Sequence, residues 1–214
     1  MHTTAAPRRA LATRNAAWAH AIAHTLARAG ATPNGVSMAG VAVAAAAAAA
    51  LALAPAASPA ARPWLLAAAA AGIQARLLCN LLDGMLAVEE GLKSATGEIY
   101  NDLPDRIADV LILVGAGYAA GSPSLGWAAA VCAVFTAYVR VLAGSLRATQ
   151  RFVGPMAKQH RMFTLTLGAI AATAEARLAL PPRAIAVALA TIAAGSVVTA
   201  IRRTRLLAAE LEAK

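Results

Sequence analysis

The sequence predicts an all-α integral membrane protein with six transmembrane helices and an N-terminal juxtamembrane amphipathic helix. Of its 214 residues, 60% are hydrophobic, and the mean hydropathy of +0.63 is high for a soluble domain. No charged residue occurs between Arg28 and Arg62 or between Asp109 and Arg140. The Ala- and Leu-rich composition alone would also fit a soluble helical bundle. A soluble amphipathic helix places a charge on its wet face every turn or two, so the uncharged stretches favour helices in lipid.

The first 34 residues are expected to form a cytosolic juxtamembrane region. Within it, residues 8–29 fit a helix with Trp18, Ile22 and Leu26 on one side and arginines elsewhere. Such a helix is suited to lie on a membrane surface beside anionic head groups. A mobile basic tail is the alternative. A Thr-Pro-Asn-Gly sequence ends the segment, because the residue before a proline avoids the helical region and Asn-Gly favours a turn.

Residues 35–214 are expected to form one membrane domain of six helices. Each apolar segment has close to the roughly 20 residues that cross about 30 Å of hydrocarbon. The segments are 36–56, 63–86, 103–121, 125–146, 162–180 and 184–202. Proline- or glycine-containing turns join the two members of each hairpin, and the longer polar connections 87–102 and 147–161 lie on the opposite side.

The basic residues set the expected orientation. With the N-terminus inside, sixteen of the nineteen Lys and Arg residues fall on the inner side, and only Arg62, Arg177 and Arg183 fall on the outer side. This bias predicts a multi-pass protein of a bacterial-type inner (cytoplasmic) membrane with both termini cytoplasmic. Because the basic residues are scattered among short loops, topology explains the formal charge of +9, and no nucleic-acid partner is expected.

Seven of the ten acidic residues fall within the 27 positions from 83 to 109. Asp83, Asp105 and Asp109 project from predicted spans near their cytosolic ends, where a carboxylate normally faces a partner, a cavity or a cation. One alternative is that they pair with Arg76 and Arg106 and only seal the helix ends.

Two amides extend this acidic group. Asn80 and Asp83 are three residues apart, and Asn101 and Asp105 are four apart, so each pair occupies one helix face. If the two helices are neighbours, as their short connection implies, four oxygen-bearing side chains converge. Oxygen ligands of this kind suit Mg²⁺, Mn²⁺ or Ca²⁺.

The same stretch resembles the signature of the CDP-alcohol phosphotransferase family, D-x2-D-G-x2-A-R-x8-G-x3-D-x3-D. Every spacing is kept without a gap by Asn80, Asp83, Gly84, Ala87, Val88, Gly97, Asn101 and Asp105. The chain departs from the signature at the first and third aspartates, which are asparagines, and at the arginine, which is Val88. A second register takes Asp105 and Asp109 as the last two acidic positions, but it needs a four-residue insertion and loses the glycine.

The resemblance implies a metal-dependent CDP-alcohol phosphatidyltransferase of phospholipid biosynthesis. The implied metal ligands for one or two Mg²⁺ or Mn²⁺ ions are Asn80, Asp83, Asn101 and Asp105, with Asp105 also the catalytic base. The implied nucleotide-binding positions are the small residues Gly84, Ala87 and Gly97. Two amides in place of two carboxylates lower the ligand charge by two, so weaker metal binding or a single-ion site is expected.

The resemblance also implies the substrates. A phosphatidyl-type group would pass from a CDP-linked lipid, expected to be CDP-diacylglycerol, to a small alcohol or polyol-phosphate acceptor, with release of CMP. Candidate phosphate-binding residues are Arg106, Arg147, Arg151, Lys158 and Arg161. Anchoring of the topology alone is the alternative role for these basic side chains.

The sequence leaves open the acceptor, the oligomeric state and whether the protein is catalytically active. The motif serves several acceptors, among them glycerol phosphate, inositol phosphate and serine. A homodimer is expected from the resemblance. The alternative function is a catalytically weak or inactive member that binds lipid or nucleotide in the membrane, which the two asparagines and Val88 favour.

Overall fold

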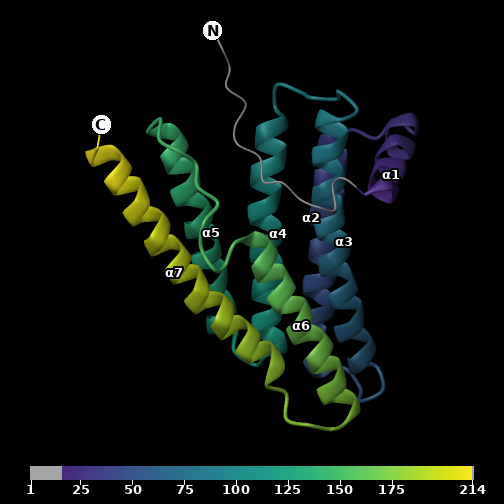
Figure 1. Ribbon diagram of the computed structural model, residues 1–214. Coiled ribbons are helices and arrows are strands. Elements are labelled where there is room, and N and C mark those ends of the chain that lie inside the picture. Colours follow the sequence, from purple (N-terminus) through teal and green to yellow (C-terminus); the bar gives the residue numbers. More distant parts are fainter. Residues whose placement is uncertain (1–15, 214) are drawn as a thin grey trace.

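The computed structural model describes residues 16–213, and this part of the chain is all-helical. Seven α-helices follow one another, with a short 3-10 turn η2 (Ala54–Ala56) after the second. They are α1 (Ala17–Arg28), α2 (Pro33–Leu53), α3 (Arg62–Val88), α4 (Gly97–Ala119), α5 (Pro123–Ser145), α6 (Lys158–Arg177) and α7 (Ala184–Glu212). Figure 1 shows α1 at one end of the bundle, against α3, and the other helices running along its length. Residues 8–15 of the predicted juxtamembrane helix lie outside the described residues.

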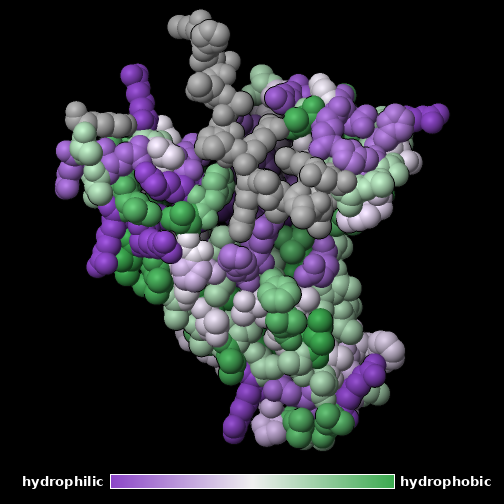
Figure 2. All heavy atoms as spheres, in the orientation of Figure 1, coloured by the Kyte–Doolittle hydropathy of each residue, from purple (hydrophilic) through white to green (hydrophobic). Residues whose placement is uncertain are grey.

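A helix covers each of the six predicted apolar segments, but four of them are both long and apolar enough to cross a membrane. These are α2 with its η2 turn, α3, α5 and α7. The helices α4 and α6 have 23 and 20 residues, but charged side chains interrupt their apolar sequence. The hydrophilic side chains gather mainly at the two ends of the molecule, with a more hydrophobic band between them (Figure 2). Four candidate spans are thus present, and the count of six stays a prediction.

Two helices extend beyond their predicted bounds by six residues or more. Helix α4 begins at Gly97, six residues before the predicted span, and α7 continues to Glu212, ten residues beyond it. Hydropathy marks where a helix crosses lipid, and both extensions are polar ends that hydropathy does not detect. Helix α4 also passes through Pro104, whose missing N–H removes one backbone hydrogen bond from its early turns.

Helix α2 lies between α3 and α4, so the expectation that the last two are direct neighbours is wrong. It packs extensively against both, whereas α3 and α4 make few contacts with each other. Helix α2 approaches α4 closely at Gly115, where a Cβ atom would lie 2.6 Å from the carbonyl oxygen of Ala48. Only glycine allows this packing. The two helices that carry the acidic residues are therefore held together by a third, uncharged helix.

Helix α1 packs on the C-terminal end of α3 through its small residues. Ala19 and Ala23 are buried against leucine and methionine side chains of α3, and Leu26 packs beside them. Two histidine–glutamate contacts, of 2.9 and 3.5 Å, also join α1 to the residues that follow α3. Trp18 and Ile22 are exposed. The predicted apolar face is therefore divided, with Leu26 on the protein and the other two side chains free to contact a membrane surface.

Candidate functional site

Buried charged side chains lie in the C-terminal half of α3, the N-terminal half and middle of α4, the first turn of α6 and the C-terminal half of α7. In Figure 1 these parts of the helices lie in the half of the bundle that also contains the connections 89–96 and 146–157. The buried charged residues are Arg76, Asp83, Asp105, Asp109, Arg161 and Arg203. A buried charge is costly unless it is paired and hydrogen-bonded, so the partners of each side chain indicate what it does.

On α3, Asn80 and Asp83 present buried oxygens that lack partners. Asp83 is 5% exposed, and its Oδ2 accepts a hydrogen bond of 2.6 Å from the Ser37 hydroxyl on α2. Its other oxygen, Oδ1, and the Oδ1 of Asn80 have no hydrogen-bond partner in the described part of the chain. Leaving a buried acceptor unsatisfied destabilises a fold, so two on one helix face point to a missing donor or cation. We call these two residues the Asn80–Asp83 pair.

On α4, the Asp105 carboxylate is surrounded by three basic side chains. One oxygen pairs with Arg76 from α3. The other lies 2.5 Å from Nζ of Lys158 on α6 and 3.5 Å from the guanidinium of Arg106. These four residues form what we call the Asp105 cluster. The alternative that the three carboxylates pair with Arg76 and Arg106 holds for Asp105 but not for Asp83 or Asp109. Lys158 adds a third cation, so the cluster carries an excess of positive charge.

One turn further along α4, Asp109 forms a one-to-one ion pair with Arg161, which we call the closed pair, although Oδ1 of Asp109 has no hydrogen-bond partner among the described residues. The two side chains are 2% and 1% exposed, and Nη2 of Arg161 lies 2.7 Å from Oδ2 of Asp109. The other guanidinium nitrogen, Nη1, donates to the Thr136 hydroxyl at 3.2 Å and to the Met156 carbonyl at 3.0 Å. Arg161 was predicted to bind phosphate. In this structure its charge is used inside the protein, because it joins α4, α5 and the connection before α6.

The other predicted residues are more exposed. Asn101 is exposed on α4 one turn before Asp105, unlike the buried Asn80–Asp83 pair. Gly84 and Ala87 are half-buried on the last turns of α3, and Gly97 begins α4. Of the loop arginines, Arg147 is exposed, and Arg151 pairs with Glu210 on α7 at 3.1 Å.

Sequence reasoning missed two contributors to this region, Ser37 and Arg203, and the contacts of a third, Arg140. Ser37 is an isolated hydroxyl in the first turns of an apolar helix, and nothing local indicates that it faces Asp83. Arg140 on α5 lies 2.5 Å from Asp102, with its guanidinium over the Phe152 ring. Arg203 on α7 donates to the Val153 and Thr136 carbonyls. In the sequence, Arg203 looks like its exposed neighbours at 202 and 205, so only the tertiary structure distinguishes it.

The donors at this site fit one divalent cation better than two. Within residues 16–213, no group of three or more His, Cys, Asp or Glu side chains is arranged to hold a metal ion. The Asn80–Asp83 pair nevertheless offers two unpartnered oxygens, one of them anionic. Mg²⁺ commonly takes one or two protein ligands and completes its shell with water and substrate phosphate. A second ion would compete with Arg76 and Lys158 for Asp105.

Comparisons with family models and with curated protein sequences each gave no match. Three solved structures of the phosphatidylinositol phosphate synthase PgsA1 of Mycobacterium tuberculosis share the fold. The complex with manganese and citrate is 23% identical, with 88% of each chain covered and a TM-score of 0.72. The structure with CDP-DAG bound is 24% identical, covering 90% of this chain and 94% of that chain, with a TM-score of 0.72. The apo form is 24% identical, covering 86% of this chain and 93% of that chain, with a TM-score of 0.67. At these identities, the likeness establishes the fold over nearly the whole chain.

Proposed function

We propose that the chain is a metal-dependent CDP-alcohol phosphatidyltransferase. It would transfer a phosphatidyl-type group from a CDP-linked lipid, CDP-diacylglycerol, to an alcohol acceptor and release CMP. The observation that carries the proposal is the Asn80–Asp83 pair, two unpartnered buried oxygens, beside a carboxylate with an excess of cations. The fold supports it, because a synthase of the CDP-alcohol phosphotransferase family with this fold has been solved with manganese and with CDP-DAG.

In this proposal, Asn80 and Asp83 hold the cation, and Asn101 and Asp105 are the further candidate ligands. Mg²⁺ or Mn²⁺ bound there supplies positive charge that neutralises the diphosphate and the departing CMP. The hydrogen bond from Ser37 fixes one oxygen of Asp83, so the other is directed away from α2 and is free to bind the ion. The small residues Gly84, Ala87 and Gly97 leave room for the nucleotide beside the backbone.

The Asp105 cluster has two proposed tasks. Lys158, Arg76 and Arg106 bind phosphate oxygens of the donor through charge-assisted hydrogen bonds. As they turn towards the donor, Asp105 is released to accept a proton from the acceptor hydroxyl. The hydroxyl oxygen then forms a bond to the lipid-side phosphorus. The bond from that phosphorus to the CMP oxygen breaks, and CMP leaves with its electron pair.

The acceptor is proposed as a small alcohol or polyol phosphate. Arg147 lies on the connection at this end of the bundle and is one candidate for an acceptor phosphate, and Arg151, which pairs with Glu210, is another. Arg161 is the weakest of the predicted phosphate ligands, since Asp109 already neutralises it.

The membrane arrangement follows from the same proposal. All six helices α2 to α7 cross the bilayer, and the charged ends of α4 and α6 sit among apolar neighbours. The site faces the cytoplasm of a bacterial-type cell with both termini, because most basic residues lie at that end. A homodimer in the inner membrane is part of the proposal.

The direct test is CMP release by purified protein. The assay contains Mg²⁺ or Mn²⁺, CDP-diacylglycerol and a panel of polyol and polyol-phosphate acceptors. We expect release with at least one acceptor, its loss on chelation of the metal, and its loss in Asp83→Ala and in Asp105→Asn. No release from the wild-type protein with any acceptor would contradict the proposal.

A non-catalytic lipid- or nucleotide-binding protein is the second candidate. It is favoured by the exposure of Asn101 and by the pairing of Asp105 with Arg76 and Lys158, which leaves few free oxygens for a second ion. This candidate predicts that CDP-diacylglycerol binds the wild-type protein and both variants equally, without any CMP release.

A further inference from the structure

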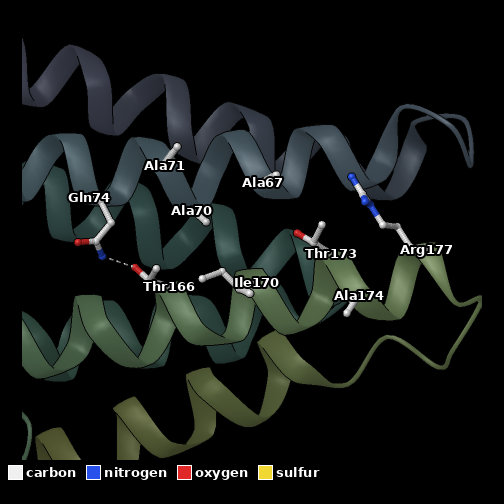
Figure 3. Close-up of a pocket in the computed structure, with 9 residues that line it drawn as sticks. All are labelled: Ala67, Ala70, Ala71, Gln74, Thr166, Ile170, Thr173, Ala174 and Arg177. Carbon is white, nitrogen blue, oxygen red and sulfur yellow. Dashed lines mark hydrogen bonds between the residues drawn. The ribbon is translucent and has the colours of Figure 1, made fainter.

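A cavity lies between α3 and α6, away from the Asp105 cluster. It is a groove of about 600 Å³, within the range of small-molecule sites. Figure 3 shows its lining, with Ala67, Ala70 and Ala71 on α3 and Ile170 and Ala174 on the adjacent α6. Ala71, Ile170 and Ala174 are exposed on the outside of the bundle. The groove is therefore apolar, and in a bilayer it faces lipid.

The two ends of the groove differ. At the end nearer the Asp105 cluster, the Gln74 amide donates a hydrogen bond of 2.8 Å to the Thr166 hydroxyl and so joins the two helices (Figure 3). At the far end, the guanidinium of Arg177 lies over the Trp64 ring, 5.3 Å from its centre. Within residues 16–213, Arg177 forms no ion pair. Tryptophan and arginine together are typical of the level of the lipid head groups.

The length of the groove matches one leaflet. From Thr166 to Arg177 it follows about three turns of α6, which is roughly 16 Å. Half of a hydrocarbon core of about 30 Å is about 15 Å. A lipid whose phosphate lies at Arg177 would therefore end its chain near the Gln74–Thr166 hydrogen bond.

Arg177 differs from Arg62, the other arginine near this end of α3, in the use of its guanidinium. Arg62 donates to the Ala54 and Pro55 carbonyls, at 3.1 and 2.7 Å, and so closes the end of α2. Glu175, on the same helix as Arg177, accepts from the backbone N–H groups of residues 183 and 184 and caps α7. The donors of Arg177 are thus left for a ligand, and a phosphodiester has the matching charge and geometry.

We propose that this groove binds one glycerophospholipid of the leaflet farther from the Asp105 cluster, with one acyl chain between α3 and α6 and the phosphodiester on Arg177. The Gln74–Thr166 hydrogen bond argues against the acyl chain of a donor bound at the Asn80–Asp83 pair, because it closes the groove on that side. Binding here needs neither metal nor turnover, so the inference is independent of the proposed function.

The test measures retained lipid on the full chain. Delipidated protein in mild detergent is titrated with phosphatidylglycerol, and the bound lipid is counted by native mass spectrometry. Wild-type protein should retain one tightly bound lipid. Arg177→Gln should weaken its binding about tenfold, since a charge-assisted hydrogen bond is lost. Arg183→Gln, at an exposed arginine of the same end, is the matched control and should change nothing.

A second pair of variants addresses the chain. Ala71→Leu with Ala174→Leu fills the groove at two exposed positions and should abolish retention of the lipid. Ala68→Leu, an exposed alanine of α3 outside the groove, is the control for an added side chain on the surface. Equal retention by the wild-type protein and the filled variant would overturn the proposal. It would also be overturned if the filled variant kept its phosphatidylglycerol but lost affinity for CDP-diacylglycerol, which would assign the groove to the donor.

Discussion

Two carboxylates on α4, one helical turn apart, are neutralised in opposite ways. Asp109 has a single cation, Arg161, and that cation makes further hydrogen bonds to Thr136 and to a backbone carbonyl. Asp105 has three cations and lies beside the unpartnered oxygens of the Asn80–Asp83 pair. In the first arrangement one cation balances one carboxylate, although Oδ1 of Asp109 has no hydrogen-bond partner within the described residues, and in the second the cations outnumber the carboxylate. The two carboxylates are alike in burial and in charge. The number of cations that face each carboxylate is what distinguishes the structural pair from the candidate active site.

The largest effect that distinguishes the two regions concerns stability. Arg161→Met leaves Asp109 buried without a cation and should cost about 3–5 kcal/mol of unfolding free energy. Lys158→Met, one turn earlier on α6, should cost less than about 1 kcal/mol, because Asp105 keeps Arg76 and Arg106. Thermal and denaturant unfolding in detergent would compare the two variants.

The same comparison has an internal check. Replacing both members of the closed pair, Asp109→Leu with Arg161→Met, removes both charges and should restore most of the lost stability. If Lys158→Met were as destabilising as Arg161→Met, the distinction between the two regions would be lost.

The second effect concerns activity, for which the change at Lys158 matters more than the change at Arg161. Lys158→Met should lower CMP release about a hundredfold, or about 2.7 kcal/mol, since it removes a cation proposed to bind the donor phosphate. Lys158→Arg keeps the charge and should recover part of the rate. Steady-state kinetics with CDP-diacylglycerol would measure both, and an unchanged rate in Lys158→Met would remove Lys158 from the proposed mechanism.

A third set of variants tests whether the Asn80–Asp83 pair binds a metal ion. Asn80→Asp adds a negative ligand and should lower the Mg²⁺ concentration for half-maximal thermal stabilisation about tenfold, equivalent to about 1.4 kcal/mol. Asn80→Leu, which offers no oxygen, should raise that concentration. The readout is the unfolding temperature at rising Mg²⁺ with CDP present. No response to Mg²⁺ in any of the three proteins would argue against a metal at these residues.

The smallest effect compares two buried serines. Ser37→Ala removes the hydrogen bond to Asp83 and should cost about 1 kcal/mol. Ser196→Ala removes a hydroxyl that is buried without a hydrogen-bond partner in the described structure, so it should be neutral or slightly stabilising. Thermal unfolding of the two variants side by side measures the difference, and equal values would mean that Ser37 does not support Asp83.

The sequence predicted where the helices lie because apolar runs between turn-forming residues are a local property. Each of the segments from 36–56 to 184–202 contains a helix. Which helices touch is not local. The alanine run of α2 has no distinct face in the sequence, so nothing in it predicted that α2 would lie between α3 and α4.

The candidate site shows the same limit at the level of side chains. The clustering of carboxylates identified Asp83, Asp105 and Asp109, because charge in an apolar context is visible in one dimension. Their partners come from far along the chain: Lys158 and Arg161 differ from Arg151 only in where the fold places them. Asn101 keeps the motif spacing to Asp105 but is exposed. Spacing fixes the face of the helix on which a residue lies, but it does not determine whether another helix covers that face at that level of the bundle.

The position of α2 also has a consequence for how the protein is made. Helices leave the ribosome in order, so α2 and α3 emerge together and the Ser37–Asp83 hydrogen bond can form early. Arg76 emerges with them, but its partner Asp105 follows only with α4, and Lys158 only with α6. An arginine destined for burial therefore spends part of translation without its carboxylate. Biogenesis must keep this end of α3 in contact with water until the later helices arrive, and ribosome-bound chains of increasing length would reveal when Arg76 becomes protected.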